Sequence, residues 1–153
     1  MRTNSKVALG VVMLAFVVTA AACSKSATAM APSPVLATDT FTGTINPLGS
    51  ASHSFTVTYA SANSDASITV NSLVSVATGA AQAITIGVGF GTVNVGVCTR
   101  VTGYTNVAAP LNTALATTTA PFAAGTFCVQ LFDNPDAPTV TEPLAYSVSV
   151  KHY

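Results

Sequence analysis

The sequence predicts an all-β fold, an antiparallel sandwich or barrel of about eight short strands. Two observations lead to this fold class. From Phe41 onward apolar residues alternate with polar ones, and no later segment shows the 3.6-residue period of a helix. Turn residues such as Gly, Pro, Asn and Asp separate the alternating stretches at intervals of roughly 10 to 15 residues. The inward-facing side chains would then fill a core between two sheets.

The first three strands are expected before residue 77. Residues 41–45 alternate until an Asn-Pro pair ends the strand, and residues 54–59 place aromatic and branched side chains on one side. Tyr59 falls in that inward register, so it is expected in the core. After a turn cluster at 61–65, the strand at 67–76 begins with clean alternation and continues irregularly.

Three more strands follow between residues 84 and 119. Residues 84–90 alternate Ile, Val and Phe with Thr and Gly, and residues 93–98 alternate Val with Asn and Gly as far as a Cys. A loop is expected at 102–110. The weaker, Thr-rich stretch at 111–119 is the sixth strand.

The last two strands lie on either side of a long loop. The strand at 127–132 follows a turn marked by Pro and Gly, and its Phe, Val and Leu share one face. A loop is expected at 133–143, which contains two prolines. The closing strand at 146–151 begins with Tyr146, which is expected to face the core.

The composition excludes one class of function. The chain has 153 residues, and only 7% of them are charged, against roughly 25% in an average soluble domain. If residues 1–22 are removed, three Lys or Arg remain against five Asp or Glu. Lys25, Arg100 and Lys151 cannot form the basic face that binds phosphates, so we expect no nucleic-acid partner.

The N-terminus has the pattern of a secretory signal peptide. Arg2 and Lys6 precede an apolar run at 7–18, and three alanines at 20–22 come directly before Cys23. A bilayer-spanning helix needs about 20 residues, and this apolar run is shorter.

A Cys at this position makes the signal resemble that of bacterial lipoproteins. The resemblance implies that the Cys23 thiol is diacylglycerated, that the signal is cut before it, and that the new amine is acylated, with palmitate among the chains. Two or more acyl chains anchor a protein stably, whereas one does so only marginally. An ordinary signal peptide with a chance Cys and a residual transmembrane anchor are the alternatives. Ser24 in place of Asp favours the outer membrane if the cell is Gram-negative.

Three regions are therefore expected. Residues 1–22 form the lipoprotein signal peptide, residues 23–40 the lipidated Cys and a flexible tether, and residues 41–153 the β-sandwich domain. The tether has no hydrophobic period and contains Pro32 and Pro34, as flexible linkers do. It would keep the domain near the membrane while allowing it to reorient.

Lipidation of Cys23 leaves an even pair of cysteines. In an oxidising compartment Cys98 and Cys128 are expected to form a disulfide. Two free, buried thiols are the alternative. A metal site is disfavoured because two Cys without clustered His cannot complete a tetrahedral ligand set.

Four segments occur in an order that resembles the bacterial pre-peptidase C-terminal (PPC) domain. They are Phe-Thr-Gly-Thr-Ile at 41–45, Ser-Phe-Thr-Val at 54–57, Ala-Gly-Thr-Phe-Cys-Val at 124–129 and Tyr-Ser-Val-Ser-Val at 146–150. The resemblance implies a jelly-roll-like β-sandwich with a non-catalytic role. Domains of that family are typically appended to secreted peptidases; some are stabilised by calcium, and some bind extracellular matrix or polysaccharide.

No catalytic constellation is expected. A Ser–His–Asp arrangement needs a base held by a carboxylate beside an activated hydroxyl. His53 and His152 are the only histidines, and His53 is expected to be a solvated residue at a strand start. The glycines at 87–91 resemble a phosphate-binding loop only by letter, because no helix follows them. They predict a bulge or a close neighbour in the sheet. We therefore expect neither enzyme activity nor a cofactor.

Two groups of residues are candidate ligand sites. Asp133, Asp136 and Glu142 share one loop and could supply oxygens to calcium, although the prolines in the loop favour a stiff, solvated turn. Tyr104, in the loop expected at 102–110, could stack on a sugar ring, because binding residues often lie on loops held by a rigid scaffold.

The sequence thus predicts a lipoprotein of the cell envelope, anchored to the outer membrane or cell surface. Its β-sandwich would be a non-catalytic binding or accessory module for an extracellular polysaccharide or protein. A structural role is the alternative, because an uncharged, Thr-rich sandwich with unprotected edge strands could associate with itself.

Overall fold

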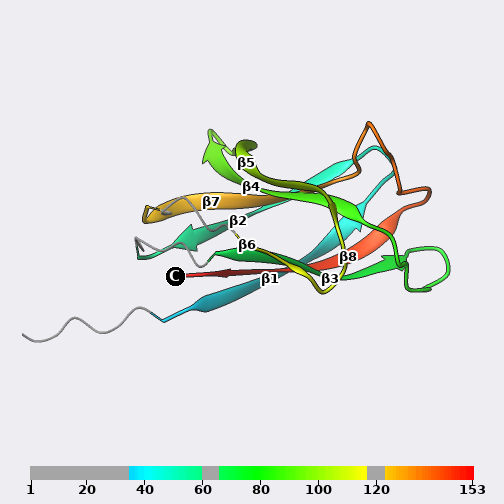
Figure 1. The fold of residues 1–153 in the computed structure, drawn as a ribbon, viewed down its shortest axis with the longest axis horizontal. Coiled ribbons are helices and arrows are strands. Elements are labelled where there is room, and N and C mark those ends of the chain that lie inside the picture. The colour runs from blue at the N-terminus through cyan, green and yellow to red at the C-terminus, as the bar shows by residue number, and fades with distance from the viewer. Residues whose placement is uncertain (1–34, 60–65, 117–122) are drawn as a thin grey trace, which may run out of the picture. The chain divides into compact units, whose positions relative to one another are not determined.

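The computed structural model describes residues 35–59, 66–116 and 123–153. The expected signal peptide, Cys23 and most of the expected tether lie outside these residues. The described residues form no helix and eight strands: β1 (Ala37–Ile45), β2 (Ser50–Val57), β3 (Ser67–Ser75), β4 (Ile86–Asn94), β5 (Val97–Ala109), β6 (Ala114–Ala116), β7 (Gly125–Phe132) and β8 (Leu144–His152). The predicted all-β class and number of strands are confirmed (Figure 1).

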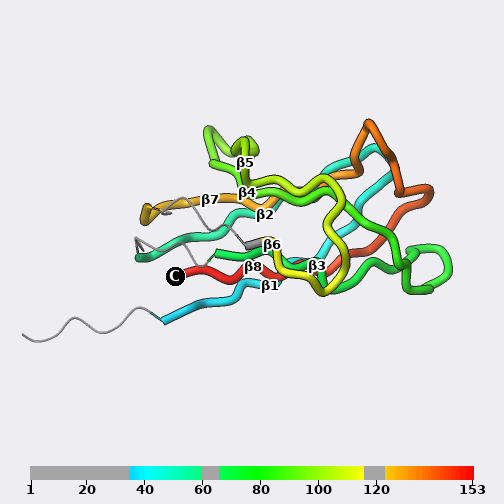
Figure 2. Tube along the Cα trace, viewed as in Figure 1, coloured from blue at the N-terminus to red at the C-terminus, as the bar shows by residue number. Residues whose placement is uncertain are grey.

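The strands form two antiparallel, four-stranded sheets. Sheet A has the order β1-β8-β3-β6, and sheet B has the order β2-β7-β4-β5. The first strand pairs with the last, the second with the seventh, the third with the sixth and the fourth with the fifth. The chain is therefore arranged as one long hairpin rolled into two layers, which is the connectivity of a jelly roll. Figure 2 shows both layers along the trace.

The core lies between the two sheets and is built from the inward side of each alternating strand. In β8 every second residue from Leu144 to His152 is buried, and the intervening ones are more exposed. Burying one such apolar side chain contributes about 1.5–3 kcal/mol. The largest fully buried side chains are Phe90, Ile45, Ile68, Leu73, Ile86, Leu131 and Leu144.

The structure corrects the prediction for residues 93–110. The chain does not continue through Val95 but turns there, and the expected loop at 102–110 lies almost entirely within β5. Val95 and Gly96 both have positive φ angles, 49° and 77°, as a two-residue hairpin turn of type I′ requires. Val is rarely found at positive φ, so a valine at this position does not indicate a turn. The alternation of three valines instead predicts a continuous strand.

Smaller differences concern strand ends and one core residue. β1 begins at Ala37 rather than Phe41, because the residues from Ala37 onward pair with β8. Tyr59 is 51% exposed, so the prediction that it lies in the core is wrong; β2 ends two residues earlier, at Val57. Tyr146 is buried as predicted. The expected irregularity in β3 is also present, as a register shift after Val70.

β5 is the least regular strand. Gly89 of β4 pairs with Thr105 but Gly91 pairs with Arg100, so residues 101–104 bulge out of the ladder. From Ile86 to Gly91 every residue of β4 is buried, which is unusual for a sheet face turned to solvent. Both neighbouring strands cover this face: the Phe132 ring of β7 lies over Gly87, and β5 curls over Gly89 and Gly91 toward β7.

Candidate functional site

The outer face of β4 carries glycines, each covered by a group from a neighbouring strand. A Cβ atom added at the first would overlap the ring of Phe132, at the second it would lie 2.7 Å from Oγ1 of Thr105, and at the third 2.8 Å from Sγ of Cys128. This confirms the expected close neighbour in the sheet. The three positions are Gly87, Gly89 and Gly91.

Cys98 of β5 and Cys128 of β7 form the predicted disulfide. The two strands are not neighbours in sheet B, because β4 lies between them, yet the Cα atoms of the two Cys are only 5.9 Å apart. The bond crosses the outer face of β4 above Gly91, whose missing side chain leaves room for both sulfurs. The disulfide therefore holds β5 in its curled position.

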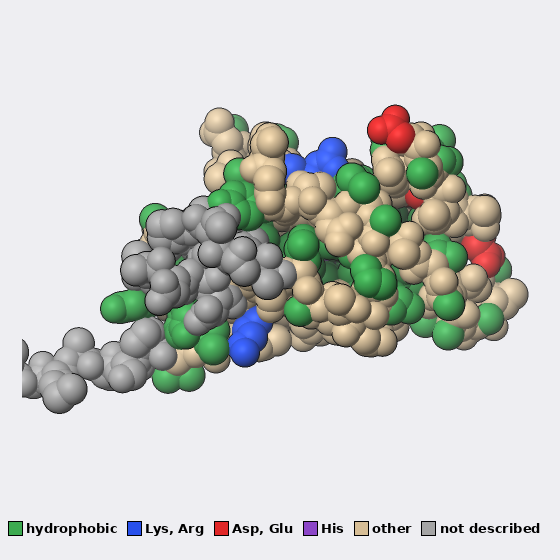
Figure 3. All heavy atoms as spheres, in the orientation of Figure 1, with side chains coloured by type: hydrophobic (Ala, Val, Ile, Leu, Met, Phe, Trp, Pro, Cys, Tyr) green, Lys and Arg blue, Asp and Glu red, His purple; other side chains and the backbone are tan. Residues whose placement is uncertain are grey.

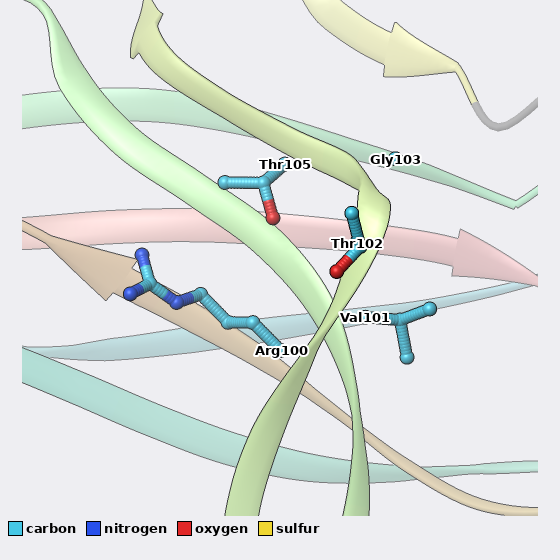
Figure 4. A pocket seen from close by; sticks show the side chains of 5 residues that line it. All are labelled: Arg100, Val101, Thr102, Gly103 and Thr105. Carbon is cyan, nitrogen blue, oxygen red and sulfur yellow. The ribbon is translucent and has the colours of Figure 1, made fainter.

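The bulge of β5 forms an open pocket of about 400 Å³ on this outer side. It is lined by Arg100, Val101, Thr102, Gly103 and Thr105. Figure 4 shows Arg100, Thr102 and Thr105 facing a common space, whereas Val101 projects away from it. Gly103 has a φ of 89°, a conformation that permits the sharp bulge. A smaller, mostly apolar hollow of about 160 Å³ lies beside Ile84 and Leu111.

Arg100 is the chemically distinctive residue of this pocket. Its Cζ atom lies 3.9 Å from the centroid of the Phe132 ring, a cation–π contact. Within the described residues Arg100 has no ion pair; the pair found there joins His152 and Asp39. A guanidinium held over an aromatic ring keeps its N–H donors in a fixed fork, which matches the oxygens of a carboxylate, sulfate or phosphate.

The pocket was not among the sequence candidates, although one signal for it exists. Arg100 is the only Lys or Arg between Lys25 and Lys151. An isolated cation in a chain with so little charge is unusual, and Figure 3 shows charged side chains as isolated spheres on a hydrophobic and uncharged polar surface. The contact with Phe132 depends on the pairing of strands far apart in sequence, which the sequence alone does not reveal.

Tyr104 does not lie in an exposed loop. It belongs to β5, is partly buried and packs against the core cluster. The prediction of a loop tyrosine poised to stack on a sugar is therefore wrong in its structural premise. Tyr104 lies in the bulge itself, next to the pocket, and it anchors the bulge to the core.

His53 is not the solvated strand-end residue that the sequence predicts. It lies within β2, partly buried between the sheets, and its ring stacks on Phe41 at a centroid distance of 4.8 Å. Its Nε2 atom lies 2.7 Å from Oη of Tyr146. Burial lowers the pKa of His53 and raises the pKa of Tyr146, so both are held neutral and the phenol can donate to the imidazole. Gly43, opposite Tyr146 in β1, leaves space for the tyrosine ring.

His152 occupies a similar position nearer the end of the sandwich. His152 is 5% exposed, its Nε2 atom lies 3.0 Å from Oδ2 of Asp39, and its ring packs against Phe55. In the described part of the chain neither histidine hydrogen-bonds a serine hydroxyl or a thiol. The bond to Asp39 links β8 to β1 within sheet A and the packing on Phe55 links the two sheets; these contacts do not assemble an activated nucleophile.

Asp133 has a structural role in the loop after β7. It is 2% exposed, its Oδ1 atom accepts hydrogen bonds from the amides of Thr139 and Val140 at 2.9 and 3.3 Å, and its Oδ2 atom accepts one from Leu48 at 3.0 Å. Burial acts to raise the pKa of this carboxyl, but the backbone hydrogen bonds outweigh it and lower the pKa below its usual value. Asp133 thus ties the loop to the β1–β2 turn.

The calcium candidates do not converge on one site. In the described ranges no three His, Cys, Asp or Glu side chains come close enough to hold a metal ion. Asp133 turns inward to the backbone amides, whereas Asp136 is exposed and Glu142 is half-buried elsewhere in the loop. Three carboxylates in one loop predict a calcium site, but in the folded protein the carboxylate of Asp133 accepts hydrogen bonds from backbone amides.

Comparison of the chain with protein-family models and with curated proteins finds no match. In the part of the chain that the structure describes, no helix has the length and hydropathy needed to cross a bilayer. The residues themselves must therefore carry any inference about function.

Proposed function

We propose that this protein is a lipid-anchored lipoprotein of the bacterial cell envelope whose jelly-roll domain binds a ligand without catalysing a reaction. The signal pattern that ends at Cys23 supports the anchor, and Ser24 favours the outer membrane. The disulfide between Cys98 and Cys128 is consistent with an oxidising compartment. The resemblance to PPC domains supports a binding or accessory role.

The binding role depends on one observation, the Arg100 guanidinium over the Phe132 ring. In the described residues it has no carboxylate partner, and the hydroxyl groups of Thr102 and Thr105 share its pocket. This combination fits an anionic group flanked by hydroxyl groups. Because the pocket is open and lies on a strand edge, it suits the side of an extended polymer. The ligand class is an acidic extracellular polysaccharide.

The experiment measures binding of the full-length protein to a carboxylated polysaccharide, alginate, and to a sulfated one, dextran sulfate, with neutral dextran as the control. We expect Arg100→Gln to weaken binding about tenfold or more, because hydrogen bonds to charged groups contribute about 1.5–3 kcal/mol. Lys151→Gln removes the other described cation, on sheet A, and should change little. Equal binding by wild type and Arg100→Gln would contradict the proposal, as would no binding to either acidic polymer.

A structural role is the second candidate, and the edge of sheet A favours it. β1 is an edge strand of nine residues whose outward side chains, from Thr38 to Thr44, are all threonine. Its one charged residue, Asp39, is in the inward register and bonds His152. An uncharged edge can pair with another copy of the chain. Size measurements in detergent over a range of concentrations test this, and a monomer throughout would count against it.

A further inference from the structure

The two ends of the sandwich can be told apart by where the strands begin. The first residue of β1 pairs with the last residue of β8, and the last residue of β2 pairs with the first of β7. The β4–β5 turn lies at this end too, because the end of β4 pairs with the start of β7. The segment that precedes Val35 joins the domain here, so we call this the tether end (left in Figure 1).

The tether end exposes large hydrophobic side chains. Val35 precedes β1, Tyr59 follows β2, Val95 lies in the β4–β5 turn and Val97 directly follows it. Such a group at one end of a domain is a candidate contact surface. Leu48, Val76 and Val107 are also exposed, but Leu48 and Val76 lie at the opposite end, and Val107 lies in the part of β5 that is far from the β4–β5 turn. The exposed fractions at the tether end are 84% for Val35, 51% for Tyr59, 97% for Val95 and 63% for Val97.

Val95 is also in an unfavourable backbone conformation. Its φ of 49° lies in the left-handed region, where a β-branched residue is a clear outlier. Asn or Gly would fit this turn position better. The side chain packs against almost nothing, so the domain gains no burial in return. A strained, exposed valine at the tip of a hairpin is best explained by a partner that buries it.

The charged side chains are distributed unevenly between the two ends of the sandwich. The exposed Lys151 is at the tether end, whereas Asp136 and Glu142 belong to the loop at the opposite end. Figure 3 shows Asp and Glu spheres toward that opposite end. Asp39, at the tether end, is hydrogen-bonded to His152. Lys151 offsets Asp39 at the tether end, whereas the opposite end is negative, so an anionic headgroup layer would repel the opposite end more strongly than the tether end.

We propose that the tether end rests on the membrane, with the Val95 tip inserted at the lipid interface. The inference rests on the proposed lipid anchor at Cys23. The tether from Cys23 to Val35 spans at most about 40 Å when fully extended, so it keeps the tether end within reach of the bilayer. Val35, Tyr59 and Val97 would contact the interface around the tip, and Lys151 would reach the headgroups.

Single tryptophans test the inference, because the chain contains none. Val95→Trp places a reporter at the tether end. Leu48→Trp is the matched control: Leu48 is also exposed at a hairpin turn with positive φ (57°), but at the opposite end. The full-length proteins are reconstituted into phosphatidylcholine vesicles that contain phosphatidylglycerol and bromine-labelled acyl chains.

We expect the Val95→Trp fluorescence to shift to shorter wavelength and to be quenched by the brominated lipid, while Leu48→Trp is unaffected. Val97→Trp, at a position with ordinary φ, serves as a second reporter if the Val95 variant folds poorly. Equal quenching at both ends, or none at either, would overturn the membrane contact. Mass spectrometry of Cys23 separates the two proposals. Protein that is acylated at Cys23 but shows no quenching of Trp at position 95 or 97 would refute only the membrane contact. Protein without acyl chains would refute the lipid anchor.

Discussion

At the scale of single residues, the polar groups that look functional in the sequence are matched to partners inside the sandwich. His53 bonds Tyr146, His152 bonds Asp39, and Asp133 accepts three backbone hydrogen bonds. Among the described residues no buried side-chain nitrogen or oxygen lacks a partner. Burying a polar group without a partner costs about 1–3 kcal/mol, so such pairing stabilises the fold.

Asp133 provides a test of this structural role. Asp133→Asn should lower the free energy of unfolding by about 2 kcal/mol, because a charged acceptor of three amides is lost. Since the pKa of Asp133 is lowered in the folded protein, the charged carboxylate stabilises the fold fully above its ordinary value of 3.8, and this stabilisation is lost as the pH falls further.

The control is Asp136→Asn, in the exposed part of the same loop, which should change the free energy of unfolding little. Urea denaturation at neutral and at acid pH measures all three proteins. A similar effect of the two substitutions at neutral pH would show that the backbone contacts of Asp133 are not important.

At the scale of the elements, β4 shows how glycine is used in this domain. Its outward glycines are covered by the Phe132 ring, Thr105 and the disulfide, so β4 is buried on both faces from Ile86 to Gly91, although one face belongs to the outside of the sandwich. The Arg100 pocket is built on this layer, because the guanidinium lies on the Phe132 ring that covers Gly87.

We predict that Gly87→Ala destabilises the domain by about 1–3 kcal/mol, because the new methyl group overlaps the Phe132 ring and forces it outward. The substitution should also disturb the Arg100 contact and weaken any binding at the pocket. Thr92→Ala, at an exposed position of the same strand, is the control and should have a small effect. Thermal unfolding measures the difference; an unaltered melting temperature for Gly87→Ala would contradict this account of β4.

The sequence predicts the elements better than it predicts their ends. Period-two alternation locates most strands, because each has one face in the core. It fails at Val95, where alternation runs through a turn, and at Tyr104, where a bulge in a strand has the composition of a loop. It also fails for His53 and Asp133, because their partners come from strands and turns distant in sequence. The Arg100 pocket is missed for the same reason.

At the scale of the whole molecule, the disulfide fastens the curled edge of the jelly roll. Cys98 and Cys128 are separated by 30 residues and lie on strands that β4 keeps apart. The sequence predicts this pair by counting cysteines, but not that the bond crosses a third strand. In the chain-entropy model a disulfide that closes a loop of this length contributes about 3.5 kcal/mol.

Replacing both cysteines, Cys98→Ala with Cys128→Ala, should therefore lower the free energy of unfolding by about 3.5 kcal/mol. Denaturant unfolding of the oxidised and reduced proteins checks this value. Reduction should bring the wild type to the stability of the double variant and leave the variant itself unchanged. If reduction destabilised the double variant equally, the effect would not come from this bond.

The position of β8 constrains when the domain can form. β8 lies between β1 and β3 in sheet A, yet it is the last of the eight described strands in chain order. Until residues 144–152 have been synthesised, β1 and β3 lack the strand that lies between them in sheet A, and the edges that pair with β8 stay unpaired. A domain whose last strand completes a sheet stays open until that strand is available, and this order of assembly would suit the export that we propose.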